Sequence, residues 1–270
     1  MTIAIIQARM SSKRLPEKTM LPLAGKPVIW HIVDRLKYCK LVSQIVVATS
    51  NHETDDPLAD YCISNNIQVF RGSLNNVLSR FLAVLDLFPS DYFVRVTGDC
   101  PLIDPEFIDD QISFLSAVDG DSLWLSAYNN ILAGQGVLSR RAINRISKNS
   151  NDPRDLEHVG SEYLANNPSK FRIFRTTPPD LTGPDRRLCI DDERDYQVMK
   201  SVYQNLWNGS PIELMEALSW LDDHPSIAKI SASVEESAIN RDISKAKSCA
   251  TSDLIQNVAW DQIRKHRSVK

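Results

Sequence analysis

The sequence predicts an α/β protein with a mostly parallel central sheet, and two observations support that fold class. Short apolar runs of strand length alternate with amphipathic runs of helix length through about the first 120 residues. Helix-start signals, such as the acidic residues from Asp55 and the proline at Pro105, stand where the longer runs begin. Strands that alternate with helices form parallel βαβ units with right-handed crossovers.

The first half of the chain follows this alternation closely. Apolar runs predict strands at residues 2–7, 44–49, 67–70 and 91–96. Amphipathic runs predict helices at residues 28–38, 55–64 and 75–87, and a further helix that Pro105 opens.

The second half is less regular. Apolar segments at residues 122–127 and 171–175 are separated by helix-like runs at 138–148 and 155–165. A short strand is expected at 187–190, ending at two aspartates, and a helix at 193–206. Residues 211–230 and 252–266 look helical, and the polar stretch 231–251 is expected to connect them flexibly. We therefore expect a main domain over residues 1–230 and a C-terminal helical extension over 231–270.

Bulk composition narrows the class of protein. The chain has 270 residues, of which 43% are hydrophobic, which is enough for one large domain with a modest appendage. A formal charge of −3 gives no sign of a nucleic-acid partner. No signal peptide and no membrane helix of ~20 apolar residues is evident, so we expect a cytoplasmic protein without a membrane partner. The five cysteines are scattered and contain no C-x-x-C pair, which supports neither a zinc site nor a disulfide framework.

A basic loop directly after the first strand is the most informative local feature. It carries two hydroxyls, Ser11 and Ser12, and four cations, Arg9, Lys13, Arg14 and Lys18. Ligands of open α/β sheets lie at the carboxyl ends of the strands, and guanidinium groups match phosphate oxygens in pairs. A solvated basic loop is the alternative, but the apolar runs on both sides favour a polyphosphate site.

Two aspartates are expected at the same sheet edge. Asp99 follows the strand at 91–96 in a Gly-Asp-x-Pro turn, where such a residue often only satisfies local backbone amides. Asp191 ends the short strand expected at 187–190, and Asp192 is the better candidate to cap the next helix. Because Mg²⁺ prefers one or two carboxylates plus substrate phosphates, we expect Asp99 and Asp191 to be magnesium ligands. The cationic loop would neutralise the triphosphate, and catalysis would consist mainly of positioning and charge stabilisation.

Standard glycine-rich phosphate motifs do not explain the loop. No G-x-x-x-x-G-K-[ST] occurs, and no G-x-G-x-x-G follows the first strand. The Gly134-Gln135-Gly136 run lies far downstream. We therefore expect neither a P-loop enzyme nor a dinucleotide-dependent dehydrogenase.

Three motifs make the chain resemble the cytidylyltransferase family that activates sugar acids with CTP, most closely its spore-coat polysaccharide biosynthesis protein F branch. They are residues 6–18 (IQARMSSKRLPEK) continuing to 23–27 (LAGKP), residues 69–73 (VFRGS) and residues 94–104 (VRVTGDCPLID). The resemblance extends more loosely through residues 157–159 and 190–191 and covers about residues 1–205.

This resemblance implies a three-layer α/β/α fold like that of nucleotide-diphospho-sugar transferases. It implies that such an enzyme joins CMP from CTP to a small acidic sugar, similar to a nonulosonic acid, and releases pyrophosphate. Asp99 and Asp191 would bind Mg²⁺. Backbone groups near Ala8, helped by Arg71, would read cytosine. Arg9, Arg14 and Lys18 would act in catalysis with Asp99. The full set expected to contact the nucleotide is Ala8, Arg9, Ser12, Arg14, Lys18, Arg71 and Thr97.

Several positions depart from the family pattern. Acidic residues are usual where this chain has Asn75, Asn76, Ser79, Gly134 and Gly136. These departures motivate a non-catalytic nucleotide-binding homologue as one alternative, and a glycosyltransferase that uses a nucleotide sugar is another. A diphosphate donor needs fewer cations than the basic loop offers, which argues against the glycosyltransferase.

Other conspicuous residues have structural explanations. His158 and His31 are expected to be packed or solvated, and three tryptophans, Trp124, Trp220 and Trp260, are expected to anchor the core or an interface. A homodimer is expected. The apolar positions of the extension would either dock on the main domain or form the dimer contact; they are Leu254, Ile255, Val258 and Ile263.

Overall fold

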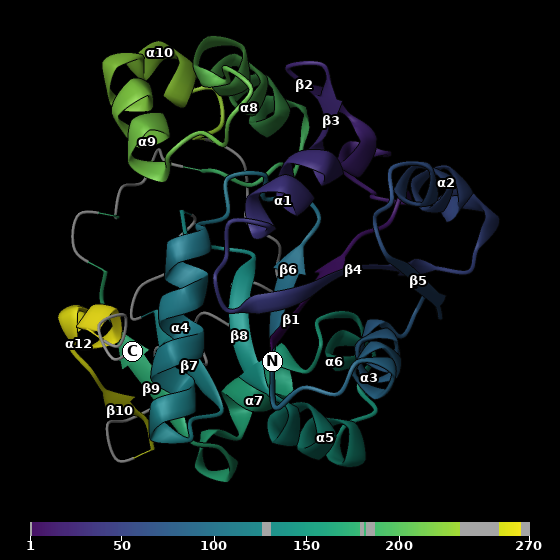
Figure 1. Ribbon diagram of the computed structural model, residues 1–270, viewed down its shortest axis with the longest axis vertical. Helices are drawn as coiled ribbons and strands as arrows, with labels where there is room; N and C mark the ends of the chain where they lie inside the picture. The colour runs from purple at the N-terminus through teal and green to yellow at the C-terminus, as the bar shows by residue number, and fades with distance from the viewer. Residues whose placement is uncertain (1, 126–130, 179–180, 182–186, 233–253, 266–270) are drawn as a thin grey trace.

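The computed structural model describes residues 2–125, 131–178, 181, 187–232 and 254–265. Among these residues, eight strands form one mixed sheet in the order β10-β9-β7-β8-β6-β1-β4-β5. Helices cover both faces of this sheet (Figure 1). The predicted three-layer α/β/α fold with a mostly parallel central sheet is thereby confirmed.

The sheet has a parallel half and a mixed half. Its central strand β1 pairs in parallel with β4 and β6, and β4 pairs in parallel with β5. Strand β8 is antiparallel to both β6 and β7, whereas β9 and β10 continue in parallel beyond β7. The strands are β1 Thr2–Gln7, β4 Val42–Ser50, β5 Val69–Gly72, β6 Tyr92–Thr97, β7 Ser122–Leu125, β8 Gln135–Ser139, β9 Ile173–Thr176 and β10 Gln256–Asn257, with a separate hairpin of β2 Pro22–Leu23 and β3 Lys26–Pro27.

Alternating side chains of β1 serve two separate apolar cores. Ala4 and Ile6 pack with α1, α2, α4, α8 and α9 on one face of the sheet. Ile3 and Ile5 pack with α3, α5 and α7 on the other face. A strand buried on both faces needs a continuous apolar run, which is why this segment is apolar throughout.

The helices follow the predicted boundaries closely in the first half. Pro105 opens α4, whose N-cap Asp104 accepts hydrogen bonds from two backbone amides. The helices are α1 Val28–Leu36, α2 Asp56–Ser64, α3 Val77–Leu87, α4 Pro105–Val118, α5 Arg140–Asn149, α6 Pro153–Glu157, α7 Ser161–Asn166, α8 Glu193–Leu206, α9 Leu214–Asp223, α10 Pro225–Ala228 and α12 Trp260–Lys265, with short 3₁₀ turns at η1 Lys18–Met20, η2 Glu53–Asp55 and η3 Pro168–Lys170.

Three predictions for the second half were wrong. Residues 187–190 form no strand. Leu188 and Ile190 are buried because they pack on the core, and an apolar run alone does not distinguish a buried loop from a paired strand. The run at 138–148 begins in β8 and becomes helical only after the N-cap Ser139. The helix at 155–165 is interrupted because Val159 and Gly160 adopt left-handed conformations, with φ of 55° and 72°.

The C-terminal segment joins the sheet before it becomes helical. Strand β10 pairs with β9, so a wholly helical segment at 252–266 was also wrong within the described part, residues 254–265. Ile263 is buried in the core that contains Ala4 and Ile6, and Ile255 is buried in the core that contains Ile3 and Ile5. Trp260 stacks on Phe107. These side chains dock on the main fold, whereas most of the polar connection expected at 231–251 lies outside the described residues.

Candidate active site

A buried aspartate shapes the basic loop that follows β1. The Asp55 carboxylate accepts a hydrogen bond of 2.8 Å from the Met10 backbone N–H and is itself fully buried. The Met10 carbonyl in turn accepts from the backbone N–H groups of Ser12 and Glu17. These bonds curl the loop back so that η1 brings Lys18 to the sheet edge.

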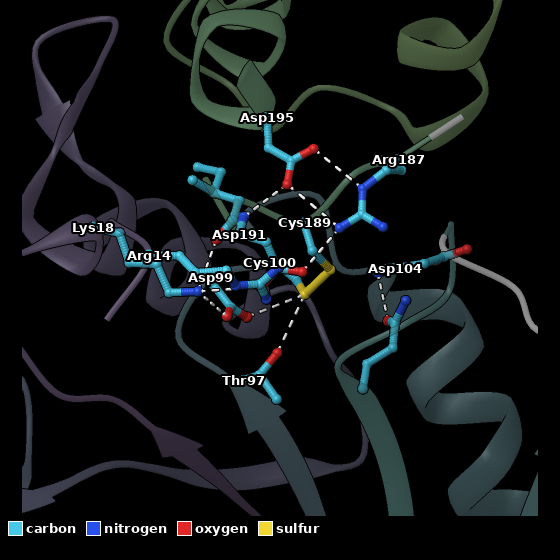
Figure 2. Close-up of a disulfide and its surroundings, with 12 residues drawn as sticks. Arg14, Lys18, Thr97, Asp99, Cys100, Asp104, Arg187, Cys189, Asp191 and Asp195 are labelled. Atoms are coloured by element: carbon cyan, nitrogen blue, oxygen red, sulfur yellow. Dashed lines mark hydrogen bonds and ion pairs between the residues drawn. A yellow bond between two sulfur atoms is a disulfide. The ribbon is translucent and has the colours of Figure 1, made fainter. Parts of the chain in front are cut away.

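Lys18 joins the two aspartates that were expected to meet. Its Nζ lies 2.5 Å from Asp99 Oδ2 and 3.5 Å from Asp191 Oδ1, and it donates to the Ile190 carbonyl at 2.8 Å. Figure 2 shows these groups converging from the first loop, the turn after β6 and the turn before α8. The structure therefore brings together residues 81 to 173 positions apart in the chain.

Asp191 is surrounded by positive charge. Its carboxylate contacts Arg14 at 2.8 Å and Arg187 at 2.8 Å, in addition to Lys18. We call the group of Arg14, Lys18, Asp99, Arg187 and Asp191 the aspartate cluster. Asp195 supports the cluster from α8 by accepting from Arg187 Nε at 3.1 Å and from the Asp191 backbone N–H at 2.9 Å.

Burial and ion pairing shift the pKa values of Asp99 and Asp195 in opposite directions. Burial opposes ionisation of Asp99, but the Lys18 ammonium and the Thr97 hydroxyl hold its pKa below the ordinary value. Burial raises the pKa of Asp195 despite its bond to Arg187. Asp99 is therefore kept ionised, which is the state that a hard cation or an ammonium group requires.

The donor set of this cluster fits a magnesium ion. Two carboxylates from separate turns share one ammonium nitrogen, so their oxygens already face a common point of positive charge. Hard cations take carboxylate oxygens as ligands, and Mg²⁺ commonly uses one or two of them. Asp99 and Asp191 could hold it, each being about one-fifth exposed.

A disulfide between Cys100 and Cys189 lies beside both aspartates, and the expectation of no disulfide framework was therefore wrong for this pair. Spacing along the chain did not suggest it because the two cysteines are 89 residues apart and meet only in the fold. Asp99 and the two sulfurs lie within 4.8 Å of one another. Sulfurs bonded to each other offer no thiolate, so in this form the group is a cross-link rather than a thiolate metal site.

The remaining cations of the predicted nucleotide site point to different partners. Arg9 pairs with Glu157 at 2.6 Å on the α6 side, and both side chains are more than one-third exposed. Arg71 contacts Asp56 at 2.6 Å and donates to the Ser50 and His52 carbonyls. Arg71 is therefore positioned on the β4–β5 side, and its role in reading cytosine stays a prediction.

Glycine is required where the turn after β6 passes the first loop. Gly98 donates its N–H to the Gln7 carbonyl at 2.9 Å, and a Cβ there would lie 2.8 Å from Ala8 Cβ. The absence of a side chain at Gly98 therefore lets the two backbones meet. This contact fixes Ala8, and with it the predicted cytosine-reading backbone, next to Thr97 and Asp99.

Three of the departures from the family pattern, at Asn76, Ser79 and Gly134, have local explanations. Asn76 caps α3 by accepting from the Ser79 N–H, and the Ser79 hydroxyl donates back to the Asn76 carbonyl. Gly134 has a φ of 74°, and a Cβ there would lie 2.4 Å from Thr97 Oγ1 and 2.6 Å from Cys100 Sγ. A side chain at residue 134 is therefore incompatible with the neighbouring disulfide in this arrangement.

A second polar group that the sequence analysis missed lies between β1, β6 and the α6–α7 turn. Arg95 donates to Gln7 Oε1 at 3.2 and 3.3 Å and to Ser161 Oγ at 3.1 Å. We call Gln7, Arg95, Glu157, His158 and Ser161 the Arg95 patch. The signal available in the sequence was a charged residue, Arg95, inside an otherwise apolar strand run.

Burial lowers the pKa of both bases in the patch. It lowers the pKa of Arg95 to about 10 and the pKa of His158 to about 4, the latter with help from the positive charges of Arg95 and Arg9. His158 is therefore neutral at physiological pH and lies in the turn rather than in a helix. His31, expected to be structural, is 2% exposed and bonded to the Leu23 carbonyl.

Comparison with known proteins identifies the family. A family model described as cytidylyltransferase matches residues 3–230. The chain belongs to the cytidylyltransferase family. It is 33% identical to spore coat polysaccharide biosynthesis protein SpsF of Bacillus subtilis, over 83% of this chain and 95% of that protein.

Two further relatives agree with this assignment. The 3-deoxy-manno-octulosonate cytidylyltransferase of Brucella ovis is 36% identical over 68% of this chain and 68% of its own. The solved structure of a cytidylyltransferase from Leptospira borgpetersenii superposes with a TM-score of 0.76 at 27% identity, covering 84% of this chain and 96% of that one. By family the protein is a CTP-dependent transferase. Among the helices that the structure describes, none has the length and apolar character to cross a lipid bilayer.

Proposed function

We propose that this cytidylyltransferase transfers CMP from CTP to the hydroxyl of a small acidic sugar and releases pyrophosphate, with Mg²⁺ held by Asp99 and Asp191. The observation that supports the proposal most directly is the meeting of Lys18 with both aspartates at the carboxyl edge of the sheet. That edge is where open α/β sheets bind their ligands.

The chain's own residues account for binding of the triphosphate. Arg14 and Lys18 are each paired with an acid that is expected to bind the metal, so they can exchange that partner for phosphate oxygens. Arg14 would donate two parallel hydrogen bonds, and Lys18 would act as a point charge on the leaving phosphates. Bound Mg²⁺ would supply Lewis-acid stabilisation at the α-phosphate.

An acidic sugar as the acceptor is inferred from the relatives. One relative is named for 3-deoxy-manno-octulosonate and another for a spore coat polysaccharide. We propose that this protein acts in the biosynthesis of a surface polysaccharide or glycan, as a cytoplasmic homodimer.

The test is pyrophosphate release from CTP and Mg²⁺ with candidate sugar acids, including 3-deoxy-manno-octulosonate. We expect turnover with a sugar acid, and its loss in Asp99→Asn and in Arg14→Ala. Lys148→Ala is the control and should keep turnover, because Lys148 is an exposed cation on α5, outside the basic loop. Full turnover in both Asp99→Asn and Arg14→Ala would refute the assignment.

A glycosyltransferase that uses a nucleotide sugar is the alternative, and ligand-induced stabilisation separates it from the proposal. A ligand that binds the folded state raises the melting temperature according to its affinity and concentration. We expect CTP with Mg²⁺ to raise the melting temperature more than any nucleotide sugar at the same concentration. The reverse order would favour the glycosyltransferase.

A further inference from the structure

The Cys100–Cys189 disulfide directly adjoins both aspartates of the cluster. Cys100 follows Asp99 in the turn after β6, and Cys189 precedes Asp191 by two residues in the turn before α8 (Figure 2). The same two turns are joined by a hydrogen bond of 2.7 Å from the Ile190 N–H to the Asp99 carbonyl. The covalent link therefore lies where it limits how far the two carboxylates can separate.

The link is accessible from one side. Cys189 is partly exposed, whereas Cys100 is 4% exposed. Thiol–disulfide exchange requires a thiolate to reach one sulfur, and the attacked sulfur is the one that solvent reaches. Disulfides of cytosolic proteins are in most cases catalytic or redox-sensing, and a disulfide with one reachable sulfur in a chain expected to be cytoplasmic is a candidate for that role.

We propose that Cys100 and Cys189 form a redox-controlled link that holds Asp99 and Asp191 in the arrangement needed for Mg²⁺ and CTP. A small dithiol would attack the Cys189 sulfur, displace Cys100 as a thiol and then release Cys189 by closing its own disulfide. The protein disulfide gains two electrons and two protons, and the dithiol loses the same number. The effect on CTP binding rests on the proposed function; the effect on the two turns does not.

The other described cysteines provide matched controls. Cys39 and Cys62 are free and buried, and burial raises the pKa of both thiols, that of Cys62 to about 12. They lie on the helical layer around α1 and α2, away from the two turns in the chain. A redox response that belongs to the link must therefore survive replacement of either one.

Hydrogen exchange at the Ile190 amide tests the link without any substrate. The full-length protein is compared in its oxidised form and after reduction by dithiothreitol. A zinc-selective chelator is present so that the reduced thiols beside Asp99 do not bind zinc. We expect exchange at Ile190 to become about tenfold faster or more on reduction, and to return on re-oxidation. Cys39→Ser should respond like the parent, whereas the double variant Cys100→Ser/Cys189→Ser should exchange fast in either condition.

Calorimetry with CTP and Mg²⁺ measures the consequence for the site. We expect the dissociation constant to rise about tenfold or more on reduction, the range seen when residues that position metal ligands are lost. Exchange at Ile190 that is unchanged by reduction, or a redox response that persists in the double serine variant, would overturn the link. Absence of CTP binding in both forms would refute the proposed function, while the exchange measurement would still decide the link.

Discussion

The aspartate cluster and the Arg95 patch lie at neighbouring strand ends but balance charge in opposite ways. In the cluster, Arg14, Lys18 and Arg187 each contact a carboxylate. In the patch, the Arg95 guanidinium donates to the neutral oxygens of Gln7 and Ser161, and His158 is held neutral. In the cluster, the cations can exchange their acids for phosphate, and the acids freed in this way can take a metal ion. A cation on neutral partners mainly affects stability and its pH dependence.

Removing one charge from the cluster should have the greatest consequence for activity. We expect Asp191→Asn to lower CTP-dependent turnover by about 10³-fold or more, because it removes an oxygen ligand and the anion that organises three cations. The measurement is kcat for pyrophosphate release. Asp86→Asn, an exposed acid paired with Arg140, is the control and should stay within about twofold of the parent. Equal losses in the two variants would contradict the role of the cluster.

Gly134, just before β8, and Gly136, within β8, test how tightly the cluster and the patch are packed. Gly134 touches Thr97 and Cys100 beside the cluster, whereas Gly136 pairs with Arg95 in the patch and has open space around its Cβ position. We expect Gly134→Ala to lower the free energy of unfolding by about 2–4 kcal/mol, from a positive φ and overpacking. Gly136→Ala should cost less than about 1 kcal/mol. Denaturant unfolding measures both, and a reversed order would contradict the structure.

The pH dependence of stability tests the neutral state of the patch. The pKa of His158 is about 4 in the folded protein and about 6.5 when unfolded. Above pH 6.5 neither state is protonated, and as the pH falls toward 4 the unfolded state takes up the proton first, so stability is lost in that window. Since His158 is partly exposed, we expect a loss of about 1–2 kcal/mol between pH 7 and 4.5 that His158→Gln lacks. The same loss in the variant would assign it to other groups.

A weak effect is expected for the ion pair between Arg9 of the basic loop and Glu157 of the Arg95 patch. Arg9 and Glu157 are 35% and 41% exposed, and exposed pairs contribute little. A double-mutant cycle with Arg9→Met and Glu157→Gln should give a coupling of less than about 1 kcal/mol, which falls further at high salt. A coupling above about 2 kcal/mol would show that the patch depends on charge after all.

The sequence predicts the parallel half of the fold because its signals are local. Apolar strand runs and helix starts lie within a few residues of each other, and Pro105 and Asp192 mark helix starts as expected. The mixed half was harder to predict from the sequence. Strand β8 includes Gly136, and it is held in the sheet by pairing with β6, which lies far from it along the chain. The break at Gly160 depends on a backbone conformation that helical periodicity does not reveal.

The candidate site was likewise only partly predictable from the sequence. The convergence of Lys18, Asp99 and Asp191 follows from residues placed near strand ends, even though the strand expected before Asp191 does not form. The disulfide was missed because it joins residues far apart in the chain. Arg187 lies only four residues before Asp191, and it was missed because residues 187–190 were expected to form a strand that does not exist. Directions of long side chains, such as Arg71 toward Asp56, are likewise set by tertiary contacts.

The account requires that Lys18 and the two aspartates together hold one nucleoside triphosphate and one metal ion. Calorimetric titration of CTP, with and without Mg²⁺, into the parent protein and Lys18→Met measures this. We predict one CTP per chain and an affinity that falls about tenfold or more when either Mg²⁺ or the Lys18 ammonium is removed. CTP binding that is indifferent to both changes would contradict the account.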